Sequence, residues 1–199
     1  MCIRDRNEWN DSQRLAILSL IHKKGERYLL KNYRPIRLTN TDYKIIAYIL
    51  LDVYKKNLDD FISKEQTIYI KGRYIGTDAR LILDIFNTAK ITMKKDCFYS
   101  LILKKAVGSI EWNFLFKTLE KFNFGSNFIK WINILYKNPT FRLKNNGWIT
   151  RTSRMIRGIR QGCPISAILY IFVAEILSNK INNNNSIAVS YTHLTLPTI

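Results

Sequence analysis

The chain alternates short apolar runs with longer stretches in which apolar residues recur every three or four positions. Arg14–Ile21 and Tyr33–Leu38 predict two strands, the second at a sheet edge because Pro35 cannot donate a ladder hydrogen bond. Cys97–Leu103 is apolar throughout and predicts a buried central strand. Phe141–Arg151 predicts a β-hairpin around Asn145-Asn146-Gly147. Helical spacing predicts helices over Thr41–Ile62, Thr77–Met93, Ile110–Phe122, Ser126–Tyr136 and Ile165–Lys180.

These elements predict an α+β fold that is mostly helical, with a small antiparallel sheet. Asn40 or Thr41 is suited to cap the first long helix, and Ser109 the third. The aromatic residues along Trp112–Trp148 recur at helical spacing, so core packing is favoured over base stacking. The expected buried face of the first long helix consists of Ile46, Ile49, Leu50, Val53, Leu58 and Phe61.

The net charge of the chain indicates which class of molecule it could bind. Lysine and arginine total 32 against 15 aspartate and glutamate residues, which gives a formal net charge of +17. Arg142–Ala174 contains six basic residues and no acidic one, so the excess is not an evenly spread solvating surface. We therefore expect attraction to polyanions, nucleic acid first.

Cysteine usage suggests an intracellular protein. Cys2, Cys97 and Cys163 form no CxxC pair and no metal spacing, which predicts reduced structural thiols in the cytoplasm or nucleus. No apolar run is long enough to span a bilayer, so no membrane partner is expected. Met1–Arg6 and Ala188–Ile199 resemble translated adapter or vector sequence and are excluded from the fold prediction.

A basic, glycine-broken stretch at Arg154–Ala167 precedes the last helix. Gly158 and Gly162 permit backbone conformations that a side chain would block, and Pro164 suits a first helical turn. A helix N-terminus behind a basic loop can bind phosphate. A loop that merely turns the chain, with its arginines in solvent, explains these local features equally well.

The residues of four sequence blocks favour the phosphate-binding loop over a loop that only turns the chain. RGIRQGCPIS at Arg157–Ser166 resembles the reverse transcriptase motif RGxxQGxPLS, and KNYRPIRLTNTDYKIIAYIL at Lys31–Leu50 resembles a block of LINE-type (non-LTR) retrotransposon enzymes. Glu65–Gly76 and Ser109–Pro139 resemble further blocks of the same family, in the same order. The resemblance implies the fingers and an incomplete palm of a right-hand polymerase. The expected organisation is 1–10 foreign or disordered, 11–95 fingers, 96–181 partial palm, and 182–199 a flexible link and foreign tail.

The resemblance also implies roles for individual residues. Lys23 and Arg34 would hold the incoming triphosphate, because two fixed cations stabilise charge on a phosphoryl group. Gln161 and Gly162 would line the nucleotide pocket. The implied partners are an RNA template and a DNA primer. The residues expected to contact nucleic acid are Arg154, Arg157, Arg160, Lys71 and Arg73.

The resemblance breaks at the catalytic segment. Ile102 stands where the family has a metal-binding aspartate, and Gly108 replaces a second aspartate. No F/YADD motif occurs in the 199 residues. The family uses Mg²⁺, and two-metal nucleotidyl transfer needs carboxylates to hold both ions. We therefore expect no intact catalytic residue and no bound metal.

The expected function is a reverse transcriptase domain fragment whose lineage performs RNA-directed DNA synthesis and which is itself inactive. Two alternatives are a non-catalytic remnant that binds nucleic acid and a translated fragment without function. A helical protein-interaction module would explain the amphipathic helices but not the order of the motifs.

Overall fold

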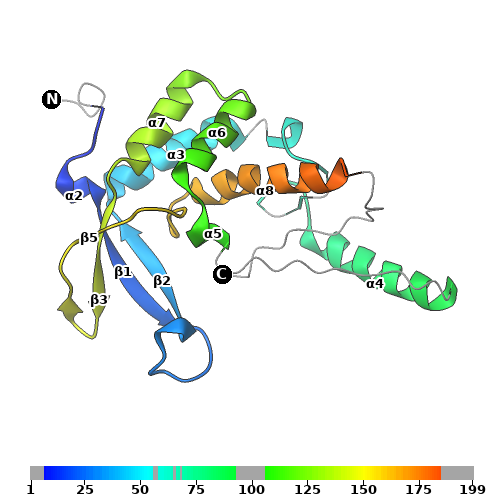
Figure 1. Ribbon diagram of the computed structural model, residues 1–199, viewed down its shortest axis with the longest axis horizontal. Coiled ribbons are helices and arrows are strands. Elements are labelled where there is room, and N and C mark those ends of the chain that lie inside the picture. Colours follow the sequence, from blue (N-terminus) through cyan, green and yellow to red (C-terminus); the bar gives the residue numbers. More distant parts are fainter. Residues whose placement is uncertain (1–6, 56–57, 65, 68, 93–105, 185–199) are drawn as a thin grey trace.

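The computed structural model describes residues 7–55, 58–64, 66–67, 69–92 and 106–184. Figure 1 shows a small twisted sheet at one end of the molecule, a group of helices packed beside it, and α4 (Ile75–Thr92) standing apart at the other end. The packed helices are α3 (Thr41–Lys55), α6 (Trp112–Lys121), α7 (Ser126–Tyr136) and α8 (Ser166–Asn182). The mixed α/β architecture agrees with the fold class predicted from the sequence.

The sheet is centred on β1 (Leu15–His22), which follows the short helix α2 (Asp11–Arg14). β1 pairs antiparallel with β2 (Tyr33–Thr39) and parallel with β3 (Thr140–Asn145). β3 pairs in turn with β4 (Trp148–Ile149). The strand order β2-β1-β3-β4 puts Pro35 on an edge strand, as predicted. The parallel β1–β3 pairing makes the sheet mixed, whereas the sequence predicted only antiparallel pairs.

Both predicted hairpins are present. The β1–β2 loop contains the 3₁₀ turn η1 (Leu30–Asn32), and the Lys23 N–H donates to the Asn32 carbonyl at 2.8 Å. β3 turns into β4 (Trp148–Ile149) through Asn146 and Gly147, whose φ angles are 47° and 85°. Positive φ at both central residues is the geometry that Asn-Gly favours in a two-residue turn. β5 (Ser153–Arg154) then returns to pair with β3.

Helix α3 begins where predicted but ends earlier, and its buried face matches the prediction only in part. Leu50 and Leu58 are in the core as expected, and Ile46 packs against it. The Asn40 Oδ1 accepts a hydrogen bond from the Asp42 N–H at 3.2 Å, which confirms the expected cap. The 3₁₀ turn η2 (Leu58–Asp60) replaces the predicted last turns. The buried residues of α3 are Tyr43, Ala47 and Leu50. Ile49 and Val53, like Phe61 beyond the helix, were expected in the core and are exposed, because the α3 segment is apolar around most of its circumference.

The segment before α6 also differs from its prediction. Ser109 ends a separate short helix, α5 (Ala106–Ser109), and the N-cap residue of α6 is Glu111. Asn123, with φ of 60°, follows the end of α6, and Gly125 is the N-cap residue of α7. α7 has the predicted bounds, and α8 begins one residue later than expected, at Ser166.

The core lies where α3, α6, α7 and α8 meet. Phe124 lies at its centre, with its ring centroid 4.8 Å from those of Phe128 and Phe172. Leu119, Leu135 and Leu169 are fully buried around this cluster. Core packing of the aromatic residues is therefore confirmed for most of Trp112–Trp148. Trp148 is the clear exception, with 83% of its surface exposed.

Some predictions fall outside the described residues. The Cys97–Leu103 strand, and Ile102 with it, belongs to the segment 93–105. None of the helices in the described ranges is both long enough and apolar enough to cross a membrane.

Candidate nucleic-acid interface

The segment Met155–Ile165, called here the glycine loop, is fixed by backbone hydrogen bonds. The Gly158 N–H donates to the Ile110 carbonyl at 2.7 Å, and the Ile159 N–H donates to the Val107 carbonyl at 2.8 Å. The Trp112 Nε1 donates to the Gly158 carbonyl at 3.0 Å. These bonds hold the loop against α5 and the start of α6.

Both glycines of the loop are required by their surroundings. Gly158 has φ of 88°, and a Cβ there would lie 2.7 Å from the Gly108 carbonyl oxygen. Gly162 has φ of 89°, and a Cβ there would lie 2.6 Å from the Arg37 carbonyl oxygen. A side chain would be strained in φ and would also collide with backbone. Gly162, expected in the nucleotide pocket, therefore packs directly against β2.

Arg160, which was expected to contact nucleic acid, lies in the core. Only 2% of its surface is exposed, and its guanidinium carbon lies 4.5 Å from the Tyr43 ring centroid and 5.9 Å from that of Tyr136. Its carbonyl accepts a hydrogen bond from the Ser166 hydroxyl at 2.7 Å, at the start of α8. A direct contact with nucleic acid would require this side chain to leave the core, so the expected role is corrected to anchoring the loop.

Burial dominates the electrostatics around Arg160. Desolvation lowers the pKa of Arg37, and the nearby Arg160 charge lowers it further. Burial likewise raises the pKa of Tyr43 and of Tyr136 well above the ordinary value for a phenol. The Nε and Nη1 atoms of Arg160 lack a hydrogen-bond partner within the described residues. Attraction of the cation to the two ring faces compensates part of the cost of burying it.

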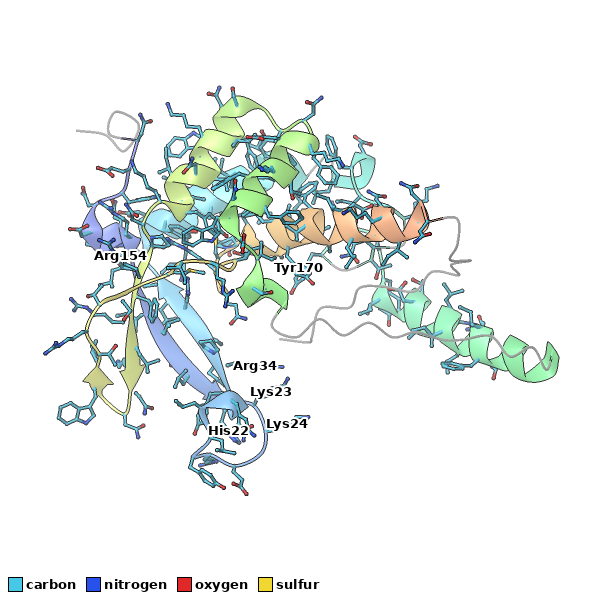
Figure 2. All side chains as sticks on the ribbon, viewed as in Figure 1. His22, Lys23, Lys24, Arg34, Arg154 and Tyr170 are labelled. Atoms are coloured by element: carbon cyan, nitrogen blue, oxygen red, sulfur yellow. The ribbon has the colours of Figure 1, made fainter. Side chains whose placement is uncertain are left out.

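The remaining predicted residues of the glycine loop and its approach are on the surface. Arg154, Arg157 and Gln161 are exposed. Arg154 pairs with Thr140, which pairs with Leu15 at the start of β1. Arg154 therefore lies at the opposite end of the sheet from Lys23, which follows the last residue of β1 (Figure 2).

The β1–β2 hairpin brings the two expected triphosphate ligands together. Arg34 is paired with Ile21, two residues before Lys23. Figure 2 shows the side chains of Lys23, Lys24 and Arg34 projecting to the same side of the hairpin. Gly162 meets the same strand at Arg37, roughly 10 Å along β2 from Arg34. His22 is engaged locally, with its Nε2 2.9 Å from the Gly25 carbonyl oxygen.

Lys71 and Arg73 have different surroundings. Lys71 is exposed, which agrees with a contact to nucleic acid. The Arg73 guanidinium instead donates to three backbone carbonyls: its Nη1 lies 2.5 Å from the Ser63 oxygen and 2.6 Å from the Gln66 oxygen, and its Nη2 lies 3.3 Å from the Ile62 oxygen. These hydrogen bonds hold the turn after η2 in place. Because the Arg73 guanidinium is engaged in them, it is less suited to bind a template backbone.

Two buried acids in the described residues hold the fold together. Glu175 on α8 accepts hydrogen bonds from the Ser63 N–H at 3.2 Å and from its hydroxyl at 3.0 Å. Asp78, in the first turn of α4, accepts a hydrogen bond from the Thr67 hydroxyl. No group of three or more His, Cys, Asp or Glu residues suited to a metal ion occurs in the ranges that the structure describes.

Gly108, one of the two positions expected to replace a family aspartate, lies in α5. The Gly108 backbone lies directly against Gly158, whereas a Cβ added to Gly108 itself would meet open space. The fold therefore has room for a side chain at this position, although the glycine supplies no oxygen donor from one. The residues at positions 102 and 108 do not fit a Mg²⁺ site.

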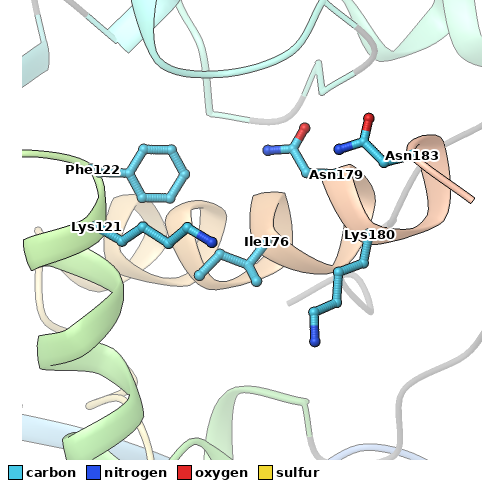
Figure 3. Close-up of a pocket in the computed structure, with 6 residues that line it drawn as sticks. All are labelled: Lys121, Phe122, Ile176, Asn179, Lys180 and Asn183. Atoms are coloured by element: carbon cyan, nitrogen blue, oxygen red, sulfur yellow. The ribbon is translucent and has the colours of Figure 1, made fainter.

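A hollow of about 360 Å³ lies elsewhere, between the C-terminal ends of α6 and α8 (Figure 3). Lysine and asparagine side chains supply most of its polar lining. Its lining residues are Lys121, Phe122, Ile176, Asn179, Lys180 and Asn183. None of them was predicted as a site residue.

Two features of the structure were missed by reasoning from sequence. Trp148 was expected in the core and is exposed at the hairpin tip. Arg37 was given no role, yet it joins β2 to the glycine loop, with its Nη1 2.5 Å from the Met155 sulfur. The Asn-Gly turn next to Trp148 was the available signal, because a residue beside a two-residue turn has few neighbours to cover it.

Comparison with known proteins agrees with the family that the sequence motifs indicate. The family "Reverse transcriptase (RNA-dependent DNA polymerase)" matches residues 21–193. The "Transposon TX1 uncharacterized 149 kDa protein" of Xenopus laevis is 36% identical over 164 residues, which are 82% of this chain and 12% of that protein. A solved structure of apo telomerase from Candida tropicalis, truncated from the C-terminal domain, is similar to this chain with 13% identity and a TM-score of 0.49. The similar region is 87% of this chain and 40% of the telomerase chain. The chain therefore belongs to the reverse transcriptase family, as a member of the LINE-type, non-LTR branch that its motifs resemble.

Proposed function

We propose that this reverse transcriptase domain binds RNA and DNA but does not itself transfer nucleotides. The observation that carries the loss of catalysis is the pair Ile102 and Gly108, which stand at the family's aspartate positions. Two-metal nucleotidyl transfer depends on carboxylates that hold the ions between the attacking and leaving oxygens. Neither an isoleucine nor a glycine side chain has an oxygen to coordinate Mg²⁺.

The charge of the sheet supports binding to nucleic acid. The five strands contain no acidic residue, and they carry Arg34, Arg37, Arg142, Lys144 and Arg154. With a net charge of +17, phosphate contacts should dominate the affinity and give little sequence preference. The partners proposed are the RNA template and DNA primer of the family, in the cytoplasm or nucleus.

The β1–β2 hairpin supports residual binding of a nucleoside triphosphate. Lys23 and Arg34 project to the same side of the hairpin (Figure 2). Gly162, which follows the exposed Gln161, meets the same strand at Arg37. Two cations at fixed positions stabilise the charge of a triphosphate without a metal carboxylate site. Lys71, Arg154 and Arg157 are the exposed cations proposed to contact the template or primer backbone.

Two assays on the full chain test the proposal. A fluorescent primer annealed to an RNA template is titrated with the chain to measure binding, and the same duplex is then incubated with deoxynucleotides and Mg²⁺ or Mn²⁺. We expect binding without extension. Ile102→Asp alone should not restore extension, because the aspartates of the F/YADD motif, which does not occur in the 199 residues, would still be missing. Template-dependent extension above a no-enzyme control would overturn the loss of catalysis, and absence of binding at low salt would overturn the binding function.

A further inference from the structure

The two faces of the sheet differ in how far they are covered. On β1, Ala16 and Leu18 are buried, so the face that they share, called here the covered face, is turned toward the rest of the molecule. Successive side chains of a strand point to opposite faces, so Ile17 and Ile21 lie on the other face. There Ile21 is 49% exposed, and Leu38, the partner of Ile17 on β2, is 53% exposed. This second face, called here the open face, is therefore accessible to a partner.

A row of three cations lies on the open face. Arg142 is the β3 partner of Ile17 and shares its face, as does Lys144, which lies roughly 7 Å further along the strand. Arg154 is paired with Thr140, two residues before Arg142, and therefore points to the same side. All three cations are exposed. They are called here the basic row, and they follow β3 in the order Arg154, Arg142, Lys144.

The middle residue of the basic row is held in position. The Arg142 Nε donates to the Thr152 hydroxyl at 2.8 Å, which fixes the guanidinium over the sheet. The five strands of the described sheet contain no aspartate or glutamate that could neutralise the row. A polyanion is therefore the occupant whose charge complements the open face.

The strands place aliphatic side chains, and no aromatic ring, between the cations of the open face. Phe141 is the β3 partner of Ala16, and Trp148 is paired with Asn145, the neighbour of Lys144, so both rings lie on the covered face or its continuation at the hairpin tip. The three Phe, Tyr or Trp residues of the described strands all point to that side; they are Tyr33, Phe141 and Trp148. The open face therefore has no ring from a strand on which an unpaired base could stack.

The open face also connects the basic row to the proposed triphosphate site. Arg34 is paired with Ile21 and lies on the open face as well. Two strand spacings, roughly 10 Å, separate its strand β2 from β3. A primer–template duplex ends where the next nucleotide enters, so a duplex on the basic row would share one face of the sheet with Arg34.

We propose that the open face binds the phosphate backbone of a nucleic-acid duplex, with phosphates of one strand along Arg154, Arg142 and Lys144. Proteins that hold unpaired strands combine cations with aromatic side chains on which bases stack, and the open face offers only the cations. In a duplex the bases are already stacked on one another, so phosphate contacts alone can hold it. The inference rests on the proposed nucleic-acid binding and names its surface and the class of nucleic acid that it takes.

The test measures binding of three fluorescent probes to the full chain: a blunt RNA–DNA hybrid, an RNA duplex of the same length, and the unpaired RNA strand. Arg142→Ala, Lys144→Ala and Arg154→Ala together should flatten the slope of log affinity against log salt by about 2–3 for both duplexes, because three phosphate contacts are lost. The slope for the unpaired strand should change by less than about 1. Arg142→Lys with Arg154→Lys keeps the charge and should retain the duplex slope.

Two neighbouring positions at the hairpin tip give a matched pair of charge variants. Ile149 is opposed to Lys144 on the open face, whereas Trp148 points to the other side, and both are exposed. Ile149→Glu and Trp148→Glu change the net charge equally. Ile149→Glu should weaken duplex binding about five-fold or more, and Trp148→Glu by less than about two-fold, because only the first carboxylate lies beside the basic row.

The outcomes distinguish the inference from the proposed function. If the chain binds the duplexes but the triple alanine variant keeps the wild-type salt slope, or if the two glutamate variants lose equal affinity, the inference is wrong and the proposed function stands. Equal changes of slope for duplex and unpaired strand would overturn the selection for duplexes. Displacement of the hybrid by polyglutamate as effectively as by unlabelled duplex of equal charge would show a general polyanion surface instead. If the wild-type chain binds none of the probes at low salt, both proposals fail.

Discussion

The guanidinium carbon of Arg160 lies 4.5 Å from the centroid of the Tyr43 ring, inside the core. This contact joins the RGIRQGCPIS block, which carries Arg160, to the block that contains both β2 and the start of α3. The arginine of the motif thus helps to hold Gly162 against β2, whereas Arg157 of the same motif is exposed.

The burial of Arg160 predicts an asymmetry between two substitutions. Arg160→Ala removes the cation–π contacts and leaves a cavity, so the free energy of unfolding should fall by about 2–4 kcal/mol. Arg160→Met fills the space without burying a charge and should cost less than about 1.5 kcal/mol. Urea unfolding followed by circular dichroism measures both. Equal, negligible losses would show that the side chain does not occupy the core in solution.

Three glycines form a graded series for backbone strain. Gly162→Ala combines a positive φ with a collision against the Arg37 carbonyl and should cost about 2–4 kcal/mol. Gly147→Ala has a similar φ but nothing nearby, so it should cost only about 1 kcal/mol. Gly125→Ala, with φ of −58° and open space, should stay within about 0.5 kcal/mol of wild type. A different order in thermal or urea unfolding would contradict the described loop geometry.

The buried phenols predict a loss of stability at alkaline pH. Burial raises the pKa of Tyr43 and Tyr136 in the folded chain, whereas in the unfolded chain both titrate near pH 10. Above about pH 10 the unfolded chain therefore binds fewer protons than the folded chain, and the free energy of unfolding falls as pH rises. Each residue should contribute about 1.4 kcal/mol per pH unit to that slope. Tyr43→Phe and Tyr136→Phe should each flatten it, and an unchanged slope in both variants would contradict the burial.

Salt dependence distinguishes the two arginines of the RGIRQG motif. Arg157→Ala should reduce the slope of log affinity against log salt by about 0.7–0.9, because one exposed phosphate contact is lost. Arg160→Met should leave the slope unchanged, because the buried guanidinium releases no counterion on binding. Binding of a labelled single strand is measured at several salt concentrations. A flatter slope for Arg160→Met would place that side chain at the interface after all.

The elements predicted well from the sequence are those that neighbouring residues determine. α7 has its predicted bounds because its apolar spacing is regular and Asn138-Pro139 follow it closely. The β3–β4 turn is predicted because Asn146 and Gly147 adopt positive φ at low cost. The resemblance to the family motif located the glycine loop in the sequence. Gly158 and Gly162 of this loop meet backbone that leaves no space for a side chain.

The failed predictions depend on contacts between distant parts of the chain. The parallel pairing of Leu15 with Thr140 has no local signal. Arginine is normally exposed, and only the approach of Tyr43 and Tyr136 from two separate helices creates the site that buries Arg160. On α3, periodicity allows more than one buried face, and tertiary packing selects the one with the small residue Ala47.

The most direct test of the account measures binding and chemistry in the same sample. The full chain is mixed with a labelled primer annealed to an RNA template at a concentration where anisotropy shows the primer to be bound. Deoxynucleotides with Mg²⁺ or Mn²⁺ are then added, and the products are separated on a gel. The account predicts a bound primer that is never extended, because Ile102 and Gly108 supply no carboxylate for the metal ions. Template-dependent extension of that bound primer would contradict it.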